Sequence, residues 1–468
     1  MIERLTSDSR RASPGAAFFA WPGAGADGRR FIPQAIERGC AAVVWEREGF
    51  AWDARWKAPN AAVVNLKSRA GFLAHEFHGR PSDSMWVCGV TGTNGKTSCS
   101  QWLAHVLSSK ETKTGVIGTL GAGFASHLAP VENTTPDALE VHRLLAEFKS
   151  AGAAAVAMEV SSHGLDQGRV NGVSFDCALF TNLSHDHLDY HGTLAAYAEA
   201  KARLFDAPGL GAAVLNLDDA FGVQLAKRAA ARGVRTIGYS LSGASASEFI
   251  SIKNINGQRV EIISSWGSAA VAIPQLGRFN VANALGVLGC LVAKGIAFKD
   301  AAGLLERLPP VAGRMQKIGE RPLVVIDYAH TPDALEKVLS ALAPEARARR
   351  GRLIVVFGAG GDRDRTKRPV MGNVAAKNAD RVVLTSDNPR GEDPQAIVAA
   401  IREGVTGECV VELDRAKAIG AAIASADAAD VVLIAGKGHE GYQEIAGRRL
   451  PFSDAAVASA ALGRRGKG

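Results

Sequence analysis

The chain has 468 residues, of which 47% are hydrophobic and 22% are charged, and its formal net charge is +7. A chain of this length is too long for one hydrophobic core and predicts about three domains, as in an enzyme. The positive charge comes without a clustered basic stripe, RNP-type aromatics or zinc-finger spacing, so small polyanionic substrates fit it better than nucleic acid.

Cysteine use and hydropathy indicate where the protein works. The six cysteines are scattered without a CxxC pair, which is typical of buried thiols in a reducing compartment. The start, MIERLTSDSRR, has no apolar signal core, and the longest apolar stretch, around ALGVLGCLVA, is too short to span a bilayer. We therefore expect a cytoplasmic protein without a membrane or nucleic-acid partner, and we expect a monomer.

Residues 1–83 predict a small α/β domain. Short apolar runs, AAFFAW and CAAVVWE, alternate with glycine-rich turns, and the polar stretch HGRPSDS is typical of a linker. From Met85 onward the pattern becomes strand, glycine loop and helix, in WVCGVT, GTNGKT and SCSQWLAHVLSS. We expect this second domain to span residues 84–312.

The third domain, expected over residues 313–468, alternates strictly between strands and helices. The apolar strands PLVVIDY, RLIVVFG, DRVVLTS and DVVLIAG are separated by helical segments such as TPDALEKVLSALAP and QAIVAAIREGV. That alternation is typical of parallel βαβ units in a doubly wound, Rossmann-like sheet. The predicted class of the whole chain is α/β in three domains.

The strongest chemical signal is GVTGTNGKTS at residues 89–98, between a predicted strand and a predicted helix. Glycines let backbone amides turn toward phosphate, Lys96 can neutralise the β and γ phosphates, and the Thr97 hydroxyl can hold Mg²⁺. Val90 stands where the strict GxxxxGK[ST] pattern has its first glycine, so this is a variant phosphate loop. LNLDD at residues 215–219 lacks the lysine of a guanine reader, so we do not expect a guanine nucleotide.

Three further features could belong to the metal and nucleotide site. Glu159 ends the apolar run AAAVAME, so it is either an ordinary strand-end glutamate or, beside a phosphate loop, a Mg²⁺ ligand. HDHLDYH at residues 185–191 could suggest zinc, but no cysteine pair is near it, which leaves a loop histidine or one ligand for the nucleotide metals. Lys201, in the helical segment AAYAEAKARLFD, would on sequence alone be a surface lysine.

TSDNPRGEDP at residues 385–394 follows a predicted parallel strand. By itself Asp-Asn-Pro-Arg is most often a turn with a solvated arginine. At the carboxyl end of a parallel strand, where open α/β sheets bind ligands, it gains a functional interpretation. The Arg390 guanidinium could take a carboxylate with two parallel hydrogen bonds, which a lysine could not do.

A set of motifs in this order resembles the Mur ligases: TGTNGKTS, MEVSSHG, TNLSHDHLDYHG, EAK, GRFNVANALG, GRM and DYAHTPDAL. The match runs from DSR near residue 8 to FSDAAVA near residue 452. Within the family, NTT at 133–135, GGDRDRTKRP at 360–369, DNPR and GKGHE are most similar to the type that adds meso-diaminopimelate. The resemblance implies an N-terminal UDP-binding domain, a central ATPase domain and a C-terminal Rossmann-like domain.

The resemblance also implies a set of site residues. For ATP it implies Gly92, Thr93, Asn94, Gly95, Lys96, Thr97, Ser98, Asn280, Arg314 and Asp327. It implies Thr97 and Glu159 on one Mg²⁺, with His187 and a carbamoylated Lys201 binding or positioning a second Mg²⁺, and the implied catalytic set is Lys96, Glu159, His187 and Lys201. For the UDP-muramoyl dipeptide it implies Ser7, Ser9, Asn133, Thr134, Thr135, Ser161, Gln167 and Arg169. For the amino acid it implies Arg363, Asp387, Asn388, Pro389, Arg390, Gly436 and Glu440.

The implied reaction is an ATP-dependent, ADP-forming ligation in peptidoglycan precursor synthesis. The γ-phosphoryl group would move to the D-glutamate carboxylate of UDP-N-acetylmuramoyl-L-alanyl-D-glutamate, and an amine of meso-diaminopimelate would attack the acyl phosphate. One alternative is a folylpolyglutamate synthase, which would not be expected to carry DNPR with GKGHE. A second is a nucleotide-gated switch without ligase turnover, and a third, a nucleic-acid-binding ATPase, rests only on the charge.

Overall fold

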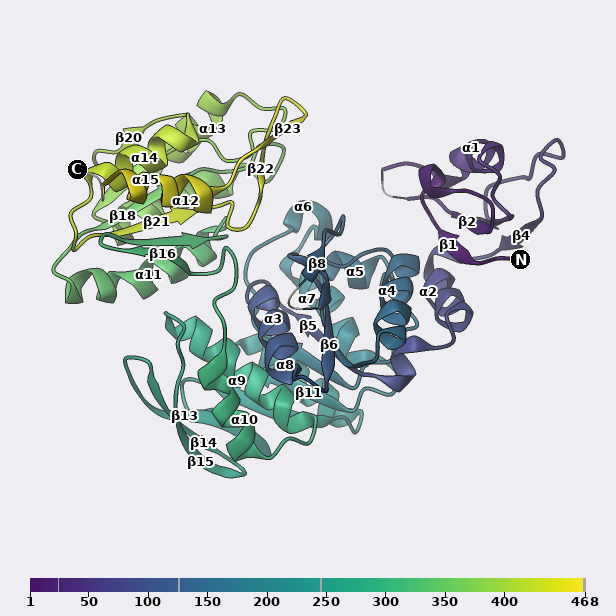
Figure 1. The fold of residues 1–468 in the computed structure, drawn as a ribbon, viewed down its shortest axis with the longest axis horizontal. Coiled ribbons are helices and arrows are strands. Elements are labelled where there is room, and N and C mark those ends of the chain that lie inside the picture. The colour runs from purple at the N-terminus through teal and green to yellow at the C-terminus, as the bar shows by residue number, and fades with distance from the viewer. Residues whose placement is uncertain (24, 125–126, 245, 466–468) are drawn as a thin grey trace.

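The computed structural model describes residues 1–468 except 24, 125–126, 245 and 466–468. The chain forms three successive α/β bodies, each built around its own sheet (Figure 1). The predicted class, α/β in three domains, is therefore confirmed. Within the described ranges, no helix combines the length and the apolar character needed to cross a membrane.

The first body has a four-stranded parallel sheet in the order β1-β2-β3-β4. Its second strand has the sequence AAFFA, and alternate side chains point to opposite faces, as in any strand. Phe18 packs with α1 on one face, while Phe19 packs with α2 and with Leu139 of the central body on the other. The elements are β1 (Arg4–Thr6), β2 (Ala16–Ala20), α1 (Ile32–Glu37), β3 (Ala42–Glu46), β4 (Asn60–Val63) and α2 (Leu66–Phe77).

The central body has an eleven-stranded sheet in the order β15-β14-β13-β12-β11-β10-β5-β9-β6-β7-β8. The strands from β13 to β6 are parallel, and antiparallel strands extend both edges. The strands are β5 (Trp86–Thr91), β6 (Lys113–Gly118), β7 (Gly121–Phe124), β8 (His127–Ala129), β9 (Ala153–Glu159), β10 (Cys177–Phe180), β11 (Ala212–Asn216), β12 (Arg235–Ser240), β13 (Glu248–Asn256), β14 (Arg259–Ser264) and β15 (Gly267–Ala272).

Helices cover both faces of this central sheet. Apolar side chains of α3, α9 and α10 form one core against it, and those of α4, α7 and α8 belong to a second core on the opposite face. The helices are α3 (Lys96–Leu107), α4 (Ala138–Ser150), α5 (Ser162–Asp166), α6 (Leu188–His191), α7 (Leu194–Ala202), α8 (Ala220–Ala231), α9 (Arg278–Ala293) and α10 (Phe298–Leu304).

The third body is doubly wound, as predicted. Its sheet has the order β16-β17-β21-β18-β19-β20, in which only β16 is antiparallel. One core holds side chains of α11, α12 and α13, and the other holds those of α14 and α15. The strands are β16 (Gln316–Glu320), β17 (Leu323–Asp327), β18 (Leu353–Phe357), β19 (Arg381–Leu384), β20 (Val410–Val411) and β21 (Val431–Ala435), with a hairpin of β22 (Tyr442–Ile445) and β23 (Arg448–Pro451). The helices are α11 (Pro332–Ala348), α12 (Lys367–Asn378), α13 (Pro394–Arg402), α14 (Arg415–Ser425) and α15 (Asp454–Arg465).

The parallel strands explain why the polar motifs lie close together in space. The phosphate loop follows β5 and Glu159 ends β9, and these two strands are hydrogen-bonded neighbours. In the third body, Asp327 ends β17, the DNPR turn follows β19 and Gly436 follows β21. Because parallel strands end at the same edge of a sheet, each body presents its polar motifs at one edge.

Candidate active site

The phosphate loop adopts a backbone that only glycine allows at two positions. Gly92 has φ +146° and Gly95 has φ +91°. A Cβ at Gly92 would lie 1.9 Å from Thr181 Oγ1, and one at Gly95 would lie 2.5 Å from Asn283 Oδ1. Both the left-handed backbone and the close neighbours therefore require glycine, whereas the variant position Val90 lies buried within β5.

Lys96 begins α3 and bends back over the loop. Its ammonium donates to the carbonyls of Gly92, at 2.8 Å, and Thr93, at 2.9 Å. Burial lowers the pKa of Lys96, and the charge of Glu159 opposes that shift. The ammonium is thus held among the loop amides at a helix N-terminus, where anions bind.

Glu159 is a fully buried carboxylate beside the phosphate loop. It accepts hydrogen bonds from Thr97 Oγ1 at 3.0 Å, from the backbone N–H of Thr119 at 2.8 Å and from Thr119 Oγ1 at 3.0 Å. The pairing of β5 with β9 predicted its proximity to Thr97. Thr119 was not predicted, because it follows β6 and no motif marks it.

Lys201 is buried, which contradicts the surface position that its sequence alone would suggest. Its Nζ donates to the carbonyl of Gly92 at 2.9 Å and lies 4.2 Å from the centroid of the Tyr197 ring. Burial, together with nearby Lys96, lowers the pKa of Lys201 well below its usual range. The lowered pKa favours the neutral amine, which is the form that reacts with electrophiles.

The histidines of HDHLDYH do not converge on one point. His187 Nε2 lies 3.5 Å from Asp186 Oδ2, whereas His191 Nε2 lies 3.0 Å from Ser162 Oγ. Burial lowers the pKa of His187 to about 4, so its imidazole is neutral near pH 7 and able to bind a metal ion. His187 also has φ +54°, which places it at a sharp bend just before α6.

A cluster with metal-ligand spacing exists elsewhere, in the core of the central body. Among the described residues, the single group of three or more His, Cys, Asp or Glu ligand atoms is Cys88, Cys177 and Cys290, whose sulfurs lie within 4.8 Å of one another. All three are fully buried among apolar side chains. Because apolar side chains surround them, we interpret them as packed thiols, as the sequence indicated.

The nucleotide residues implied by the resemblance lie around one cavity of about 390 Å³. Arg314 donates to Thr97 Oγ1 at 3.1 Å and stacks 4.4 Å from the Tyr328 ring. Asp327 accepts the backbone N–H groups of Met315 and Ala329, each at 2.8 Å. The cavity lining includes Thr93, Asn94, Gly95, Lys96, Thr97, Ser98, Asn280, Arg314 and Asp327, together with Glu159, His187 and Lys201. Gly92 lies behind it.

A second cavity, of about 1080 Å³, lies between the central and third bodies. The central body contributes Asn133, Thr134, Ser161 and Arg169, and the third body contributes Arg363, Asp387, Asn388, Arg390, Gly436 and Glu440. Thr135, Gln167 and Pro389 do not line it. Thr135 and Gln167 instead accept hydrogen bonds from Arg169, at 2.7 Å to the Thr135 carbonyl and 2.8 Å to Gln167 Oε1, and so hold its guanidinium in place.

The DNPR turn forms the far end of the second cavity. Arg390 has φ +51°, and its Nη1 donates to the Gly361 carbonyl at 2.7 Å. Asn388 donates to Glu440 Oε2 at 2.8 Å. A Cβ at Gly436 would lie 2.5 Å from Asp387 Oδ2, so glycine lets the two loops meet. The turn therefore exposes polar groups to a cavity, as its position after a parallel strand predicted.

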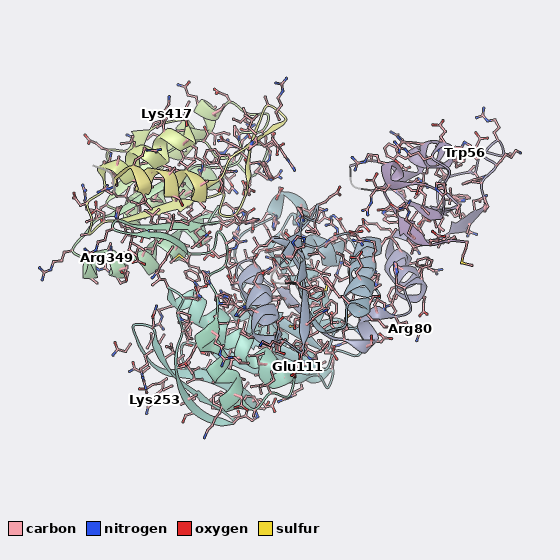
Figure 2. The ribbon with its side chains drawn as sticks, in the orientation of Figure 1. Trp56, Arg80, Glu111, Lys253, Arg349 and Lys417 are labelled. Carbon is pink, nitrogen blue, oxygen red and sulfur yellow. The ribbon has the colours of Figure 1, made fainter. Side chains whose placement is uncertain are left out.

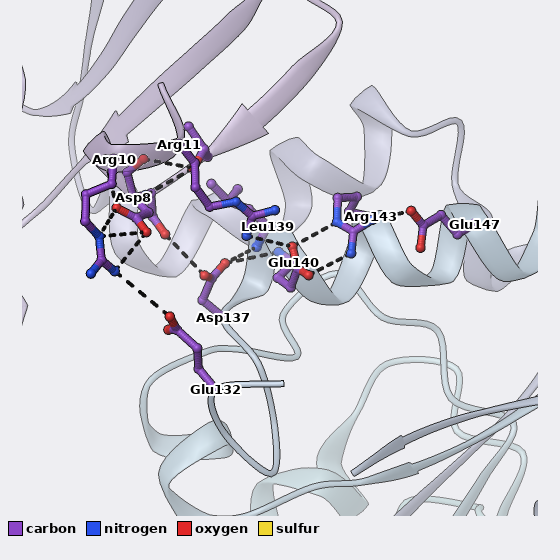
Figure 3. A network of polar contacts seen from close by, with 11 residues as sticks. Asp8, Arg10, Arg11, Glu132, Asp137, Leu139, Glu140, Arg143 and Glu147 are labelled. Atoms are coloured by element: carbon purple, nitrogen blue, oxygen red, sulfur yellow. Dashed lines mark hydrogen bonds and ion pairs between the residues drawn. The ribbon is translucent and has the colours of Figure 1, made fainter. Parts of the chain in front are cut away.

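Ser7 and Ser9 lie in the first body and line neither cavity. Ser7 Oγ donates to Asp137 at 3.2 Å, and Ser9 Oγ donates to Gln34 at 2.7 Å. Around them, a polar network joins the first body to the start of α4 (Figure 3). In it Arg10 lies 4.0 Å from Glu132, and Arg11 lies 3.6 Å from Glu140. Ser7 therefore lies at the interface between the two bodies, whereas Ser9 is hydrogen-bonded within the first body.

Comparisons with known proteins agree with this geometry. Three family models match: the Mur ligase family catalytic domain at residues 1–78, the Mur ligase middle domain at 90–291, and the Mur ligase glutamate ligase domain at 313–438. The UDP-N-acetylmuramoyl-L-alanyl-D-glutamate--2,6-diaminopimelate ligase of Chromobacterium violaceum is 52% identical over 100% of this chain and 95% of its own length.

Solved structures similar to this chain include a diaminopimelate ligase and a folylpolyglutamate synthase. A structure of a UDP-N-acetylmuramoyl-L-alanyl-D-glutamate--2,6-diaminopimelate ligase is 38% identical, with a TM-score of 0.69, over 99% of this chain and 95% of that one. A folylpolyglutamate synthase of Mycobacterium tuberculosis, solved with ADP and AMPPCP, has a TM-score of 0.66 over 85% of this chain and 95% of that one. At 20% identity this second likeness concerns the fold alone. Three family models match, and a relative is 52% identical over 100% of this chain. The chain therefore belongs to the Mur ligase family.

Proposed function

We propose that this protein is an ATP-dependent ligase that adds meso-diaminopimelate to the D-glutamate of UDP-N-acetylmuramoyl-L-alanyl-D-glutamate. One observation carries the proposal: the phosphate-loop cavity and the larger cavity are contiguous. They share the lining residues Thr134, Ser161, Asp186, His187, Tyr328 and His330. A carboxylate at this junction would meet the ATP phosphates on one side and an amine from the third body on the other.

The proposed reaction has two steps. The carboxylate oxygen takes the γ-phosphoryl group and ADP leaves; then the amine attacks the acyl carbon, phosphate leaves and the nitrogen loses its proton. The first step brings two anions together, and the Lys96 ammonium within the loop offsets that charge. Arg169, whose guanidinium is held by Thr135 and Gln167, would bind the muramoyl dipeptide with Asn133, Thr134 and Ser161.

Mg²⁺ fits the donors present beside the phosphate loop. Thr97 and Glu159 would hold one ion, His187 and a carbamoylated Lys201 would bind or position a second, and when bound the ions would neutralise phosphate charge. The Glu159 carboxylate, which is buried and accepts hydrogen bonds from hydroxyl and amide donors, supports this assignment. An ammonium would repel a cation, but the lowered pKa of Lys201 favours the neutral amine that can add CO₂ and become an anionic carbamate.

The proposal assigns a role to each body. Residues 1–83 would bind the UDP end, with Ser7 and Ser9 nearest it; residues 84–312 would bind ATP and the dipeptide; and residues 313–468 would bind the amino acid. We also propose that the protein works as a cytoplasmic monomer on small molecules. The cysteines support a reducing compartment, because all six are free and five are buried.

A coupled ADP-release assay tests the proposal. Purified protein is given ATP, Mg²⁺, the UDP-muramoyl dipeptide and meso-diaminopimelate, and each component is omitted in turn. We expect ADP release only with all of them, together with a product heavier by one diaminopimelate less one water. Release of ADP without an amine would favour a nucleotide switch, and turnover of folate with glutamate would favour a folylpolyglutamate synthase.

A further inference from the structure

Lys437 lies directly behind the amino-acid end of the larger cavity. It follows β21, its side chain is fully buried, and it lines neither cavity. Its Nζ donates to Asn388 Oδ1 at 2.9 Å and to Glu440 Oε2 at 2.8 Å. A buried ammonium therefore contacts two side chains that do line the cavity.

The ammonium fixes which way the Asn388 amide faces. The backbone N–H of Glu444 donates to the same Asn388 oxygen at 2.9 Å. An ammonium and a backbone N–H can only donate, so the atom between them must be the amide oxygen. The amide nitrogen then faces Glu440, to which it donates at 2.8 Å. Its second N–H has no hydrogen-bond partner among the described residues and is available to a ligand.

Glu440 is oriented by the same contacts. Its Oε2 receives both the Lys437 ammonium and the Asn388 amide, while its Oε1 receives no hydrogen bond from the residues that the structure describes. The pair therefore offers the cavity one N–H donor and one carboxylate oxygen, near the Arg390 guanidinium. The Asn388 N–H donor and the adjacent Glu440 acceptor complement an amino-acid end that carries both a carboxylate and an ammonium.

We propose that Lys437 is a positioning residue that sets specificity for the far end of the amino-acid substrate. It holds Asn388 as a donor toward the substrate carboxylate and leaves one Glu440 oxygen for the substrate ammonium. This inference rests on the proposed function, because meso-diaminopimelate has such a zwitterionic far end and L-lysine has only the ammonium. Without the Lys437 ammonium, the Glu444 N–H still holds the Asn388 oxygen but one of its two donors is lost, so the amide rotates more readily and can offer its oxygen, which repels a carboxylate.

The test is the substitution Lys437→Met, which keeps length but removes the charge and the donors. We expect kcat/KM for meso-diaminopimelate to fall about ten- to a hundredfold, the effect of losing a hydrogen bond to a charged group. The preference for meso-diaminopimelate over L-lysine should fall with it, while KM for ATP stays within about twofold. The matched control is Lys417→Met, because that lysine is 74% exposed on α14, on the outer side of the third body (Figure 2).

Two further measurements separate positioning from simple structural support. Lys437→Gln keeps N–H donors without the charge, so it should retain more of the substrate preference than Lys437→Met at a similar melting temperature. In a double-mutant cycle, Lys437→Met should cost little more once Asn388→Ala is present. Unchanged preference in a folded Lys437→Met or Lys437→Gln protein, or strict additivity with Asn388→Ala, would overturn the inference. A wild-type protein that does not use meso-diaminopimelate would instead overturn the proposed function.

Discussion

Arg390→Ala should weaken use of meso-diaminopimelate by an amount that the structure constrains. A hydrogen bond to a charged group contributes about 1.5–3 kcal/mol, and a guanidinium can give two to one carboxylate. Arg390 already donates Nη1 to the Gly361 carbonyl, and its side chain is 22% exposed, so the full sum is not available. We expect kcat/KM to fall about 30- to 1000-fold, which corresponds to a loss of roughly 2–4 kcal/mol of transition-state stabilisation.

Backbone strain does not contribute to the expected effect of Arg390→Ala. Arg390 has φ +51°, and alanine carries the same left-handed cost as arginine, whereas glycine would relieve it. Arg390→Lys keeps the charge but loses the planar pair of donors, so it should recover only a small part of the loss. Arg55→Ala is the control, because that guanidinium is 89% exposed in the first body.

The assay is coupled ADP release at varied meso-diaminopimelate, L-lysine and ATP. The expected pattern is a large loss for meso-diaminopimelate, a much smaller loss for L-lysine, and KM for ATP within about twofold of wild type, because Arg390 does not line the nucleotide cavity. The reasoning is wrong if the wild type uses L-lysine as well as meso-diaminopimelate. It is also wrong if Arg390→Ala leaves the preference intact.

Three further substitutions test the phosphate-loop side. Lys96→Ala should abolish ligation, because its ammonium is the cation held within the loop; near-normal ADP release would contradict this. Lys201→Ala should be inactive and partly rescued by a small carboxylic acid that replaces the carbamate, whereas a lysine with only a packing role would not respond to added acid. Gly95→Ala should raise KM for ATP at least about tenfold, since its Cβ would lie 2.5 Å from Asn283 Oδ1 at φ +91°. Gly303→Ala, where no atom lies within 4 Å of the added Cβ, should keep KM for ATP unchanged, and equal effects would refute the steric argument.

Local sequence was sufficient for the parts of the site that lie next to strand ends. The phosphate loop, Glu159 and the DNPR turn each follow an apolar run, and the run itself predicts a buried strand. Parallel strands then bring their carboxyl ends to one edge, so neighbouring motifs meet without further information. The strand order places β9 beside β5, and β19 near β21. The ends of these strands therefore lie close together, as the predictions assumed.

Sequence was insufficient where a role depends on contacts between distant segments. Lys201 lies among alanines in AAYAEAKA, where helical spacing places Tyr197 beside it, but nothing in that run shows that the Gly92 carbonyl also contacts it. Thr119 lies in no motif, and Lys437, although it belongs to GKGHE, shows its contacts with Asn388 and Glu440 only once β21 and β19 are placed. The antiparallel pairing of β14 with β13 and with β15 was also not predicted.

The turn at Gly313 and Arg314 lies between the nucleotide cavity and the amino-acid end of the larger cavity. On one side, Arg314 donates to Thr97 Oγ1 at 3.1 Å, inside the nucleotide cavity. On the other, a Cβ at Gly313 would lie 2.2 Å from the backbone nitrogen of His439, in the loop that also carries Lys437 and Glu440. The nucleotide site and the loop of the amino-acid pocket therefore contact adjacent residues of one turn, Arg314 and Gly313. We therefore expect a displacement of this turn to change both sites together, because Arg314 touches the nucleotide site and Gly313 packs against the loop of the amino-acid pocket.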